Sequence, residues 1–179
     1  LARPGLTADG SFEVIPFHMT SVWTDLSKPP VAVGPSIHAR VADIERYEAA
    51  HGRIPKGAWV LMRTDWSKRS DPEAYQNFDE TGQHTPGPST EAVRFLVEQR
   101  DVLGFGSEAI GTDAGQGYHL RPPYPCHYYM HGAGRYGLQC LSNLDLLPPA
   151  GAVLICPPLK IEKGSGSPLR VLALVGASA

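Results

Sequence analysis

The segment around His127 carries the residue types best suited to chemistry in this chain. His127 and His131 lie four residues apart, so a helix would place both imidazoles on one face, where they could bind one metal ion. Gln139 follows His127 by twelve residues and could add an amide oxygen, although zinc prefers thiolate, imidazole or carboxylate ligands. The same pattern also suits two unrelated histidines at a helix edge and a glutamine paired with the backbone. We interpret the segment as the second half of a metal site whose first half should lie upstream.

Asp113 is the carboxylate that could act together with these residues. It follows a strand predicted over residues 109–112 and lies in a glycine-containing turn. A carboxylate in this place is either a catalytic group or a residue that caps the turn, and the residues alone favour the turn. The chain has no HExxH or HxH spacing, no GxSxG elbow and no Walker pattern, and the glycines that begin at Gly132 are interpreted as a plain loop. These absences leave a serine-hydrolase triad and a nucleotide-binding loop without an anchor.

The composition is that of a globular protein. The length of 179 residues predicts one compact domain, and the hydrophobic (42%) and charged (19%) fractions suit a soluble fold. A formal net charge of −2 gives no electrostatic basis for binding nucleic acid or an anionic membrane. No apolar run approaches the roughly 20 residues that span a bilayer, and residues 1–12 lack a secretory pattern. Three cysteines without close spacing argue against a disulfide framework, so we expect a cytoplasmic protein.

Short helices and strands must position the candidate residues, because 19 glycines and 17 prolines mark many turns. We predict helices over residues 44–50 (capped by Asp43 and ended by Gly52), from Ser89 onward, and over 126–132. Strands are predicted near 12–15 and over 59–64, 102–105, 109–112, 137–141, 152–156 and 169–175. Interleaved strands and helices indicate an α/β fold, and the polar segment 65–87 is expected to be a loop. Residues 1–42, which are rich in proline, are predicted to form an irregular arm before an α/β domain over 43–179.

Six segments occur in an order that is typical of one enzyme family. They are Ile54–Trp66, Pro86–Leu96, Ile110–Asp113, His127 with Gln139, Asn143–Pro148 and Pro158–Leu174. The set resembles the cyclase family of metal-dependent hydrolases, which includes bacterial kynurenine formamidase and isatin hydrolase, and it leans toward the isatin-hydrolase-like branch. The resemblance covers about residues 43–174. It implies a swivelling β/β/α domain, with a mixed central sheet and flanking helices, that forms homodimers or homotetramers.

The resemblance also implies an activity and a cofactor. Family members typically hydrolyse an amide or open a lactam-like ring of a small molecule, and Mn²⁺ or Zn²⁺ activates the water. The ligands come mainly from an upstream His-x-Gly-Thr-His-x-Asp-x-Pro-x-His motif, and a later His and Glu complete the site. His127 matches the later His and Gln139 falls on the Glu position, whereas nothing in residues 1–40 matches the upstream motif. If the upstream ligands are truly absent, the expected cofactor is none.

Three functional alternatives follow. The chain could be a hydrolase of a cyclic or aryl amide that takes further ligands from His18, His38, His84 or a neighbouring subunit. It could be a metal-independent cyclase or isomerase in which His127 transfers the proton. It could also bind a small aromatic ligand, or a complete subunit, without chemistry of its own.

The residues that we expect at the site have the following roles. They are His127 (catalytic and metal-binding), Asp113 (catalytic, supporting), Gln139 (metal-binding or substrate-orienting), His131 (supporting, substrate-binding), and Trp66 and Tyr128 (stacking surfaces, or ordinary core).

Overall fold

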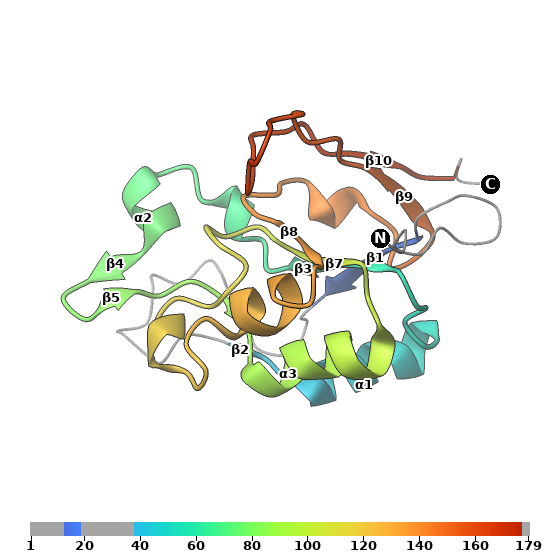
Figure 1. Ribbon diagram of the computed structural model, residues 1–179, viewed down its shortest axis with the longest axis horizontal. Helices are drawn as coiled ribbons and strands as arrows, with labels where there is room; N and C mark the ends of the chain where they lie inside the picture. The colour runs from blue at the N-terminus through green and yellow to red at the C-terminus, as the bar shows by residue number, and fades with distance from the viewer. Residues whose placement is uncertain (1–12, 19–37, 177–179) are drawn as a thin grey trace.

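A six-stranded mixed sheet forms the centre of the computed structural model, which describes residues 13–18 and 38–176 (Figure 1). In spatial order the strands are β10 (Leu172–Leu174), β9 (Ala152–Ile155), β1 (Glu13–His18), β3 (Trp59–Arg63), β7 (Gly104–Ser107) and β8 (Tyr136–Leu138). Strands β1, β3, β7 and β8 run parallel, whereas β9 is antiparallel to both of its neighbours. The predicted α/β class with a mixed central sheet is therefore confirmed.

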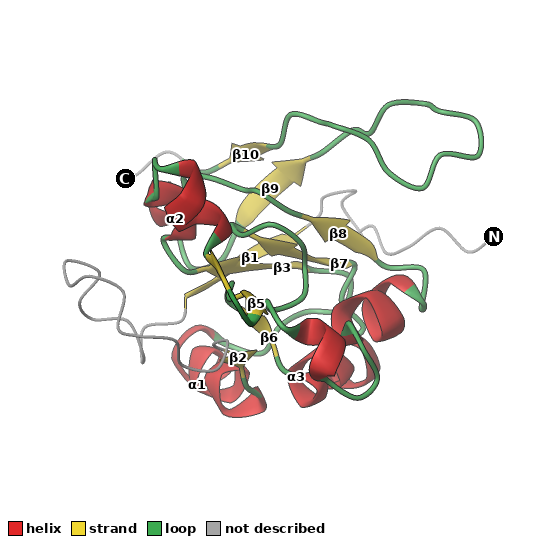
Figure 2. Cartoon of the chain, turned by 90° about the vertical axis from the view of Figure 1, so that its left-hand side faces the viewer, coloured by secondary structure: helices red, strands yellow, loops and turns green. Residues whose placement is uncertain are grey.

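Helices cover one face of this sheet (Figure 2). They are α1 (Val41–His51), α3 (Thr90–Arg94), which continues into the π-helical turn η2 (Phe95–Gln99), and the π-helical turn η4 (Cys126–His131). Short 3₁₀ turns occur at η1 (Trp66–Lys68), η3 (Gly117–His119) and η5 (Leu144–Leu146). The predicted helices at 44–50, from Ser89 and at 126–132 are all present.

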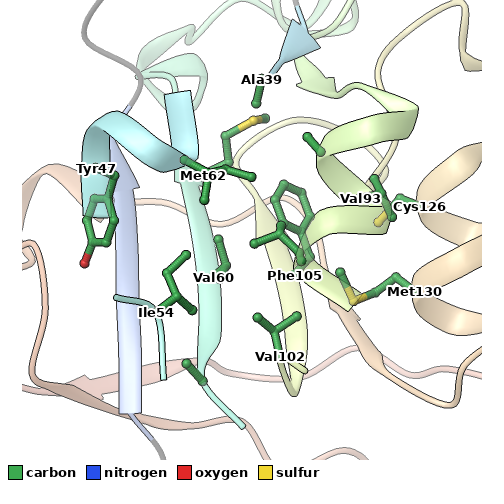
Figure 3. Packing of buried hydrophobic residues seen from close by; sticks show 14 residues of the cluster. Ala39, Tyr47, Ile54, Val60, Met62, Val93, Val102, Phe105, Cys126 and Met130 are labelled. Atoms are coloured by element: carbon green, nitrogen blue, oxygen red, sulfur yellow. The ribbon is translucent and has the colours of Figure 1, made fainter. Parts of the chain in front are cut away.

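Strand β3 is buried on both faces, which explains its continuous apolar sequence. Val60 and Met62 point toward the helices, and they pack with Phe105, Val93 and Met130 in one core cluster (Figure 3). The alternate side chains of the strand join a second cluster on the opposite face, which contains Trp59, Leu61, Leu103, Leu138, Leu141, Leu144, Ala152 and Leu154. The central strands are thus held by apolar packing on both sides.

The helix ends follow the sequence signals with one correction. Ser89 caps α3 as predicted, and its Oγ accepts the Ala92 N–H at 3.2 Å. Asp43 was expected to start α1, but the helix begins at Val41. The Asp43 carboxylate lies inside the first turn and accepts the backbone N–H of Arg40 at 2.9 Å, so it stabilises the start from the third helical position.

The segment 65–87 is more ordered than the predicted loop. It contains η1, helix α2 (Pro72–Gln76) and a hairpin of β4 (Phe78–Asp79) and β5 (Gly82–Gln83). At its end β6 (Gly87–Pro88) pairs in parallel with β2 (His38–Ala39). Helix α2 forms because Asp71 accepts the Ala74 N–H at 2.8 Å and a proline occupies the first helical position.

Two further expectations differ from the structure. Residues 109–112 were predicted as a strand but form bends, because the chain turns there and Gly111 takes a φ of +84°. The first 42 residues were predicted as an irregular arm with a strand near 12–15, and β1 is such a strand, but it pairs inside the sheet with β3 and β9. The rest of that arm up to residue 37 lies outside the described residues. Within the described part of the chain, no helix has both the length and the apolar character needed to cross a membrane.

Candidate active site

The carboxyl ends of the parallel strands form the edge at which the predicted site residues gather. Strand β7 ends at Ser107, and the loop that follows leads to Asp113 and then to η4. Strand β8 ends at Leu138, directly before Gln139. In sheets with parallel strands, ligand sites form beyond the carboxyl ends of the strands. We therefore take this edge as the candidate active site.

Asp113 and His127 make the central contact of this edge. The Asp113 Oδ2 atom lies 2.5 Å from His127 Nδ1. The same carboxylate accepts the backbone N–H groups of Cys126 at 2.6 Å and of His127 at 3.2 Å, so it also caps the first turn of η4. The Asp113 side chain is 5% exposed and that of His127 is 60% exposed. Because Nδ1 donates to the carboxylate, Nε2 is the ring nitrogen left to accept a proton or to bind an ion.

Two glycines allow the loop that carries Asp113 to lie against neighbouring backbone. A Cβ atom at Gly87 would come 2.1 Å from the backbone nitrogen of Ala114. A Cβ atom at Gly115 would come 2.3 Å from the carbonyl oxygen of Gln83. Any larger residue at either position would therefore displace the loop.

His131 lies beside His127, as the four-residue spacing predicted, with ring centroids 4.9 Å apart and nearly perpendicular planes. Both of its ring nitrogens are already engaged. Its Nδ1 lies 3.1 Å from the Arg135 carbonyl oxygen and its Nε2 lies 3.1 Å from Thr112 Oγ1. Since a carbonyl only accepts, Nδ1 carries the hydrogen and Nε2 accepts from the threonine hydroxyl in the neutral ring. His131 therefore supports the site through these bonds.

Gln139 connects the end of β8 to the loop before Asp113. Its side chain is exposed, and its Oε1 accepts the backbone N–H of Gly111 at 2.7 Å. This is the backbone pairing that the sequence left open as the alternative to a metal ligand. The amide nitrogen of Gln139 keeps both of its hydrogens available to a ligand.

The two predicted aromatic residues lie in different surroundings. Trp66 is 4% exposed, its indole N–H donates to the Tyr75 carbonyl at 2.8 Å, and the Arg69 guanidinium lies 3.6 Å from its ring centroid. Its ring therefore packs inside the fold and has little surface to offer a ligand. Tyr128 is 62% exposed on η4, and its ring contacts Tyr129 at a centroid distance of 4.9 Å.

The buried carboxylate of Glu108 was not singled out by its sequence context. It is 1% exposed and accepts the Thr64 N–H at 2.5 Å, the Thr64 hydroxyl at 3.1 Å and the Ser67 hydroxyl at 2.8 Å. The Tyr75 hydroxyl donates to the Glu108 carbonyl at 2.7 Å, and burial raises the pKa of that hydroxyl, which keeps it a donor. Glu108 thus fastens the end of β3 to the end of β7. A glutamate between a strand and a turn gives no signal of this role in sequence.

The Cys126 thiol does not suit nucleophilic chemistry. The side chain is fully buried, and burial raises the pKa of the thiol, so the reactive thiolate is disfavoured.

The described residues do not by themselves fit a divalent metal ion. Over residues 13–18 and 38–176, no three His, Cys, Asp or Glu side chains form a group that could hold one. The His84 Nε2 atom is engaged by Thr81 at 2.8 Å and Asp79 at 3.1 Å in the β4–β5 hairpin. The side chains of His18 and His38, the other two suggested ligands, lie outside the description. Among the described residues at this edge, the free imidazole nitrogen is His127 Nε2, and one such ligand is fewer than the three protein ligands of a typical catalytic zinc site.

A hollow of about 700 Å³ lies where α1 and α3 begin. It is lined by Arg40, Val41, Ala42, Ser89, Thr90, Glu91, Leu120 and Arg121. None of the predicted site residues lines it, so the candidate site rests on the Asp113–His127 contact and not on this hollow.

Comparison with known proteins identifies the family of this chain. Residues 8–114 match the family model "Cyclase: Putative cyclase". The chain belongs to the cyclase family. The isatin hydrolase of Roseibium aggregatum is 53% identical to this cyclase-family chain over 133 residues, which are 74% of the chain and 50% of that enzyme.

Solved structures share the cyclase-family fold. Isatin hydrolase A from Labrenzia aggregata, bound to benzyl benzoate, matches with a TM-score of 0.81 and 53% identity over 90% of this chain and 60% of its own. An isatin hydrolase bound to the product analogue thioisatinate matches with a TM-score of 0.82 and 41% identity. The match covers 96% of this chain and 66% of that enzyme's chain. A structure described as a potential metal-dependent hydrolase with cyclase activity shares the fold alone. It is 21% identical, has a TM-score of 0.63, and the match covers 91% of this chain and 64% of that chain. The chain thus spans half to two thirds of the length of these relatives.

Proposed function

We propose that this chain belongs to a hydrolase that opens a cyclic aryl amide of the isatin type. The observation that carries the proposal is the 53% identity to the isatin hydrolase of Roseibium aggregatum over 74% of the chain. The thioisatinate complex of a 41% identical isatin hydrolase supports the same class of substrate.

His127 is the proposed acid–base residue. Lactam hydrolysis requires that the attacking water lose a proton and that the leaving nitrogen gain one. In the proposed step His127 Nε2 takes the proton as the water oxygen bonds to the lactam carbonyl carbon, while Nδ1 keeps its hydrogen on Asp113, whose charge stabilises the imidazolium. The C–N bond then breaks and the proton passes to the nitrogen, so that water and lactam give an aryl amine and a carboxylic acid.

Gln139 and His131 have supporting roles in this proposal. The free amide hydrogens of Gln139 suit a donor that orients a substrate carbonyl, because its oxygen already accepts from Gly111. His131 holds the segment between Thr112 and Arg135 in place. Tyr128 is proposed as an exposed aromatic contact for the substrate.

We further propose Mn²⁺ or Zn²⁺ as the ion to test. The description of a 21% identical structural neighbour as a potential metal-dependent hydrolase motivates the test. Since the described residues do not fit such an ion by themselves, any bound ion would need ligands beyond them, and no step above is routed through it.

Ring opening of isatin by the purified chain tests the proposal directly. We expect the isatin absorbance to decay with the wild-type chain, with or without added Mn²⁺ or Zn²⁺, and we expect His127→Gln to abolish the decay. Elemental analysis of the same sample measures metal per chain. Absence of ring opening for isatin and related aryl lactams, at all metal concentrations, would contradict the proposal.

A metal-independent proton transfer, such as a cyclisation or isomerisation, is the second candidate. The Asp113–His127 contact favours it, because that pair can hold and move a proton without an ion. Rearrangement of a substrate without uptake of water, after exhaustive chelation, would support this candidate, and hydrolytic ring opening of isatin, with or without metal, would support the first.

We also propose a homodimer or homotetramer in a reducing, cytoplasmic setting. Exposed apolar side chains on β9 and β10, at Ile155, Leu172 and Leu174, support an association surface. The three free cysteines support the reducing setting. Light scattering measures the assembly.

A further inference from the structure

A row of aromatic rings leads to His127 from one side. The ring centroids of Tyr118 and Tyr124 lie 6.5 Å apart, and those of Tyr124 and His127 lie 6.2 Å apart with their planes at 71°. Tyr118 is 63% exposed and Tyr124 is 48% exposed. The row therefore has open ring surface directly beside the residue that we propose as the acid–base group.

The chain holds Tyr124 in this place against its own conformational preference. Its φ is +50°, in the left-handed region that aromatic residues rarely adopt. Its N–H donates to the Gly117 carbonyl at 2.9 Å, and its carbonyl accepts the Tyr128 N–H at 2.9 Å. Strained backbone of this kind persists where the surrounding structure fixes it, and it is concentrated at functional sites.

Close packing positions the ring as well as the backbone. A Cβ atom at Gly117 would lie 3.4 Å from Tyr124 Cδ1, which is van der Waals distance, so the Tyr124 ring lies close against the backbone at Gly117. Within residues 38–176 the hydroxyl groups of Tyr118 and Tyr124 form no hydrogen bond. Packing against neighbouring rings, and not a buried polar partner, thus sets the orientation of Tyr124 next to His127.

We propose that Tyr124, assisted by Tyr118, forms the subsite for the aryl ring of the ligand and selects aromatic over aliphatic lactams. This inference rests on the proposed function for the identity of the substrate. Aromatic rings meet one another edge to face or offset, with centroids 4.5–7 Å apart, which matches the spacing of this row. An aryl lactam stacked on Tyr124 would bring the carbonyl of its fused lactam ring toward His127.

Two lactams that differ only in the aromatic ring provide the test. 2-Oxindole carries a benzene ring fused to the lactam, and 2-pyrrolidinone has the lactam alone. Dissociation constants from NMR titration are compared for the wild-type chain and for Tyr124→Asn, because asparagine removes the ring but tolerates the left-handed backbone. Melting temperature verifies folding. Tyr136→Ala is the matched control, since Tyr136 is 52% exposed but stacks on Trp59 at the opposite end of β8.

We expect Tyr124→Asn to weaken 2-oxindole binding by about 10- to 100-fold and to leave 2-pyrrolidinone binding unchanged. Tyr136→Ala should change neither. Equal weakening of both lactams, no weakening of 2-oxindole, or failure of the folded wild-type chain to bind 2-oxindole would overturn the inference.

Isatin turnover separates the failure of this subsite from the failure of the proposed function. If the chain hydrolyses isatin but kcat/KM does not fall in Tyr124→Asn, the subsite is wrong and the hydrolase proposal stands. If isatin is not hydrolysed while 2-oxindole binding depends on Tyr124, the hydrolase proposal is wrong and the aryl subsite stands.

Discussion

The Asp113 carboxylate contacts His127 twice, at the ring Nδ1 atom (2.5 Å) and at the backbone nitrogen (3.2 Å). One buried side chain therefore fixes both the orientation of the imidazole and the start of the helical turn that carries it. A loss of Asp113 should consequently affect activity and stability together.

Asp113→Asn tests this coupling. The amide cannot supply the negative charge that favours Nδ1–H and the imidazolium, so we expect kcat to fall by about 10²- to 10⁴-fold. The weaker helix cap should lower the free energy of unfolding by about 1 kcal/mol. Asp71→Asn is the control, because Asp71 caps a different helix, α2, through the Ala74 N–H at 2.8 Å. An Asp113→Asn variant as active as Asp71→Asn would contradict the role of the pair.

The two neighbouring histidines should behave differently when replaced by glutamine. His127→Gln should reduce kcat by about 10²- to 10⁴-fold with little change in melting temperature, because the ring is 60% exposed. His131→Gln should mainly lower stability, by about 1–2 kcal/mol, because both ring nitrogens are bonded within the fold. Kinetics and thermal unfolding of the two variants measure the difference. The reverse pattern would assign the chemistry to His131.

Acid should lower the stability of the fold because it protonates Glu48. This carboxylate receives two bonds from Arg100, at 2.6 and 2.7 Å, and it also accepts the Ile54 N–H. The bond from Arg100 is the main cause that holds the pKa of Glu48 below its ordinary value. Because the pKa of Glu48 is lower in the folded state, ionised Glu48 contributes fully to the stability of the fold above its unfolded pKa of about 4.3. This contribution is lost as the pH falls through the folded pKa.

Glu48→Gln should therefore destabilise the chain by about 1–2 kcal/mol at pH 7 and flatten the loss of stability from about pH 5 downward. Urea unfolding at several pH values measures both effects. Glu98→Gln is the control, because Glu98 and Arg94 form a solvent-exposed pair. A pH dependence that is the same in Glu48→Gln and in the wild type would exclude Glu48 as its source.

Glu108→Ala should be among the most destabilising substitutions at the site. It would leave the Thr64 N–H and two hydroxyl groups without their acceptor beneath the ends of β3 and β7. We expect a loss of about 3 kcal/mol or more, and a smaller loss for Glu108→Gln, which keeps one acceptor oxygen. Denaturant unfolding gives the ranking. If the two variants are equally stable, the carboxylate is not the element that joins the strands.

Gly87→Ala should disturb the site through the backbone of the loop and without changing any site side chain. The added Cβ would meet the backbone of Ala114 at 2.1 Å and would push the loop that carries Asp113. We expect the free energy of unfolding to fall by about 1–3 kcal/mol, and we expect kcat/KM to fall with it. Gly166→Ala is the matched control, since a Cβ atom there has no neighbour within 4 Å. Unchanged activity in a destabilised Gly87→Ala would show that the loop tolerates the shift.

Local signals were sufficient for most elements of the fold. The Ser89 cap, the continuous apolar run along residues 59–62 and the proline before the turn at 126–131 each act within a few residues, so they can be read without knowledge of the fold. The prediction failed at 109–112, where Gly111 bends the chain, and in 65–87, where the cap formed by Asp71 before Pro72 starts a helix inside a segment expected to be a loop. Element ends also shifted by up to three residues, as expected for frayed termini.

The sequence by itself determined that the chain is α/β and that His127 and His131 share a helical face, because these properties depend on local order and periodicity. Its ordered motifs also gave the resemblance to the cyclase family, which the comparisons confirm. Only the tertiary structure decided which imidazole nitrogen is free, that Gln139 bonds to Gly111, that Trp66 is buried and that Glu108 joins two strands. Each of these depends on contacts between segments far apart in the chain, and sequence spacing carries no record of such distances. The same reason explains why Tyr124 became a candidate only after the loop that holds it beside His127 was seen.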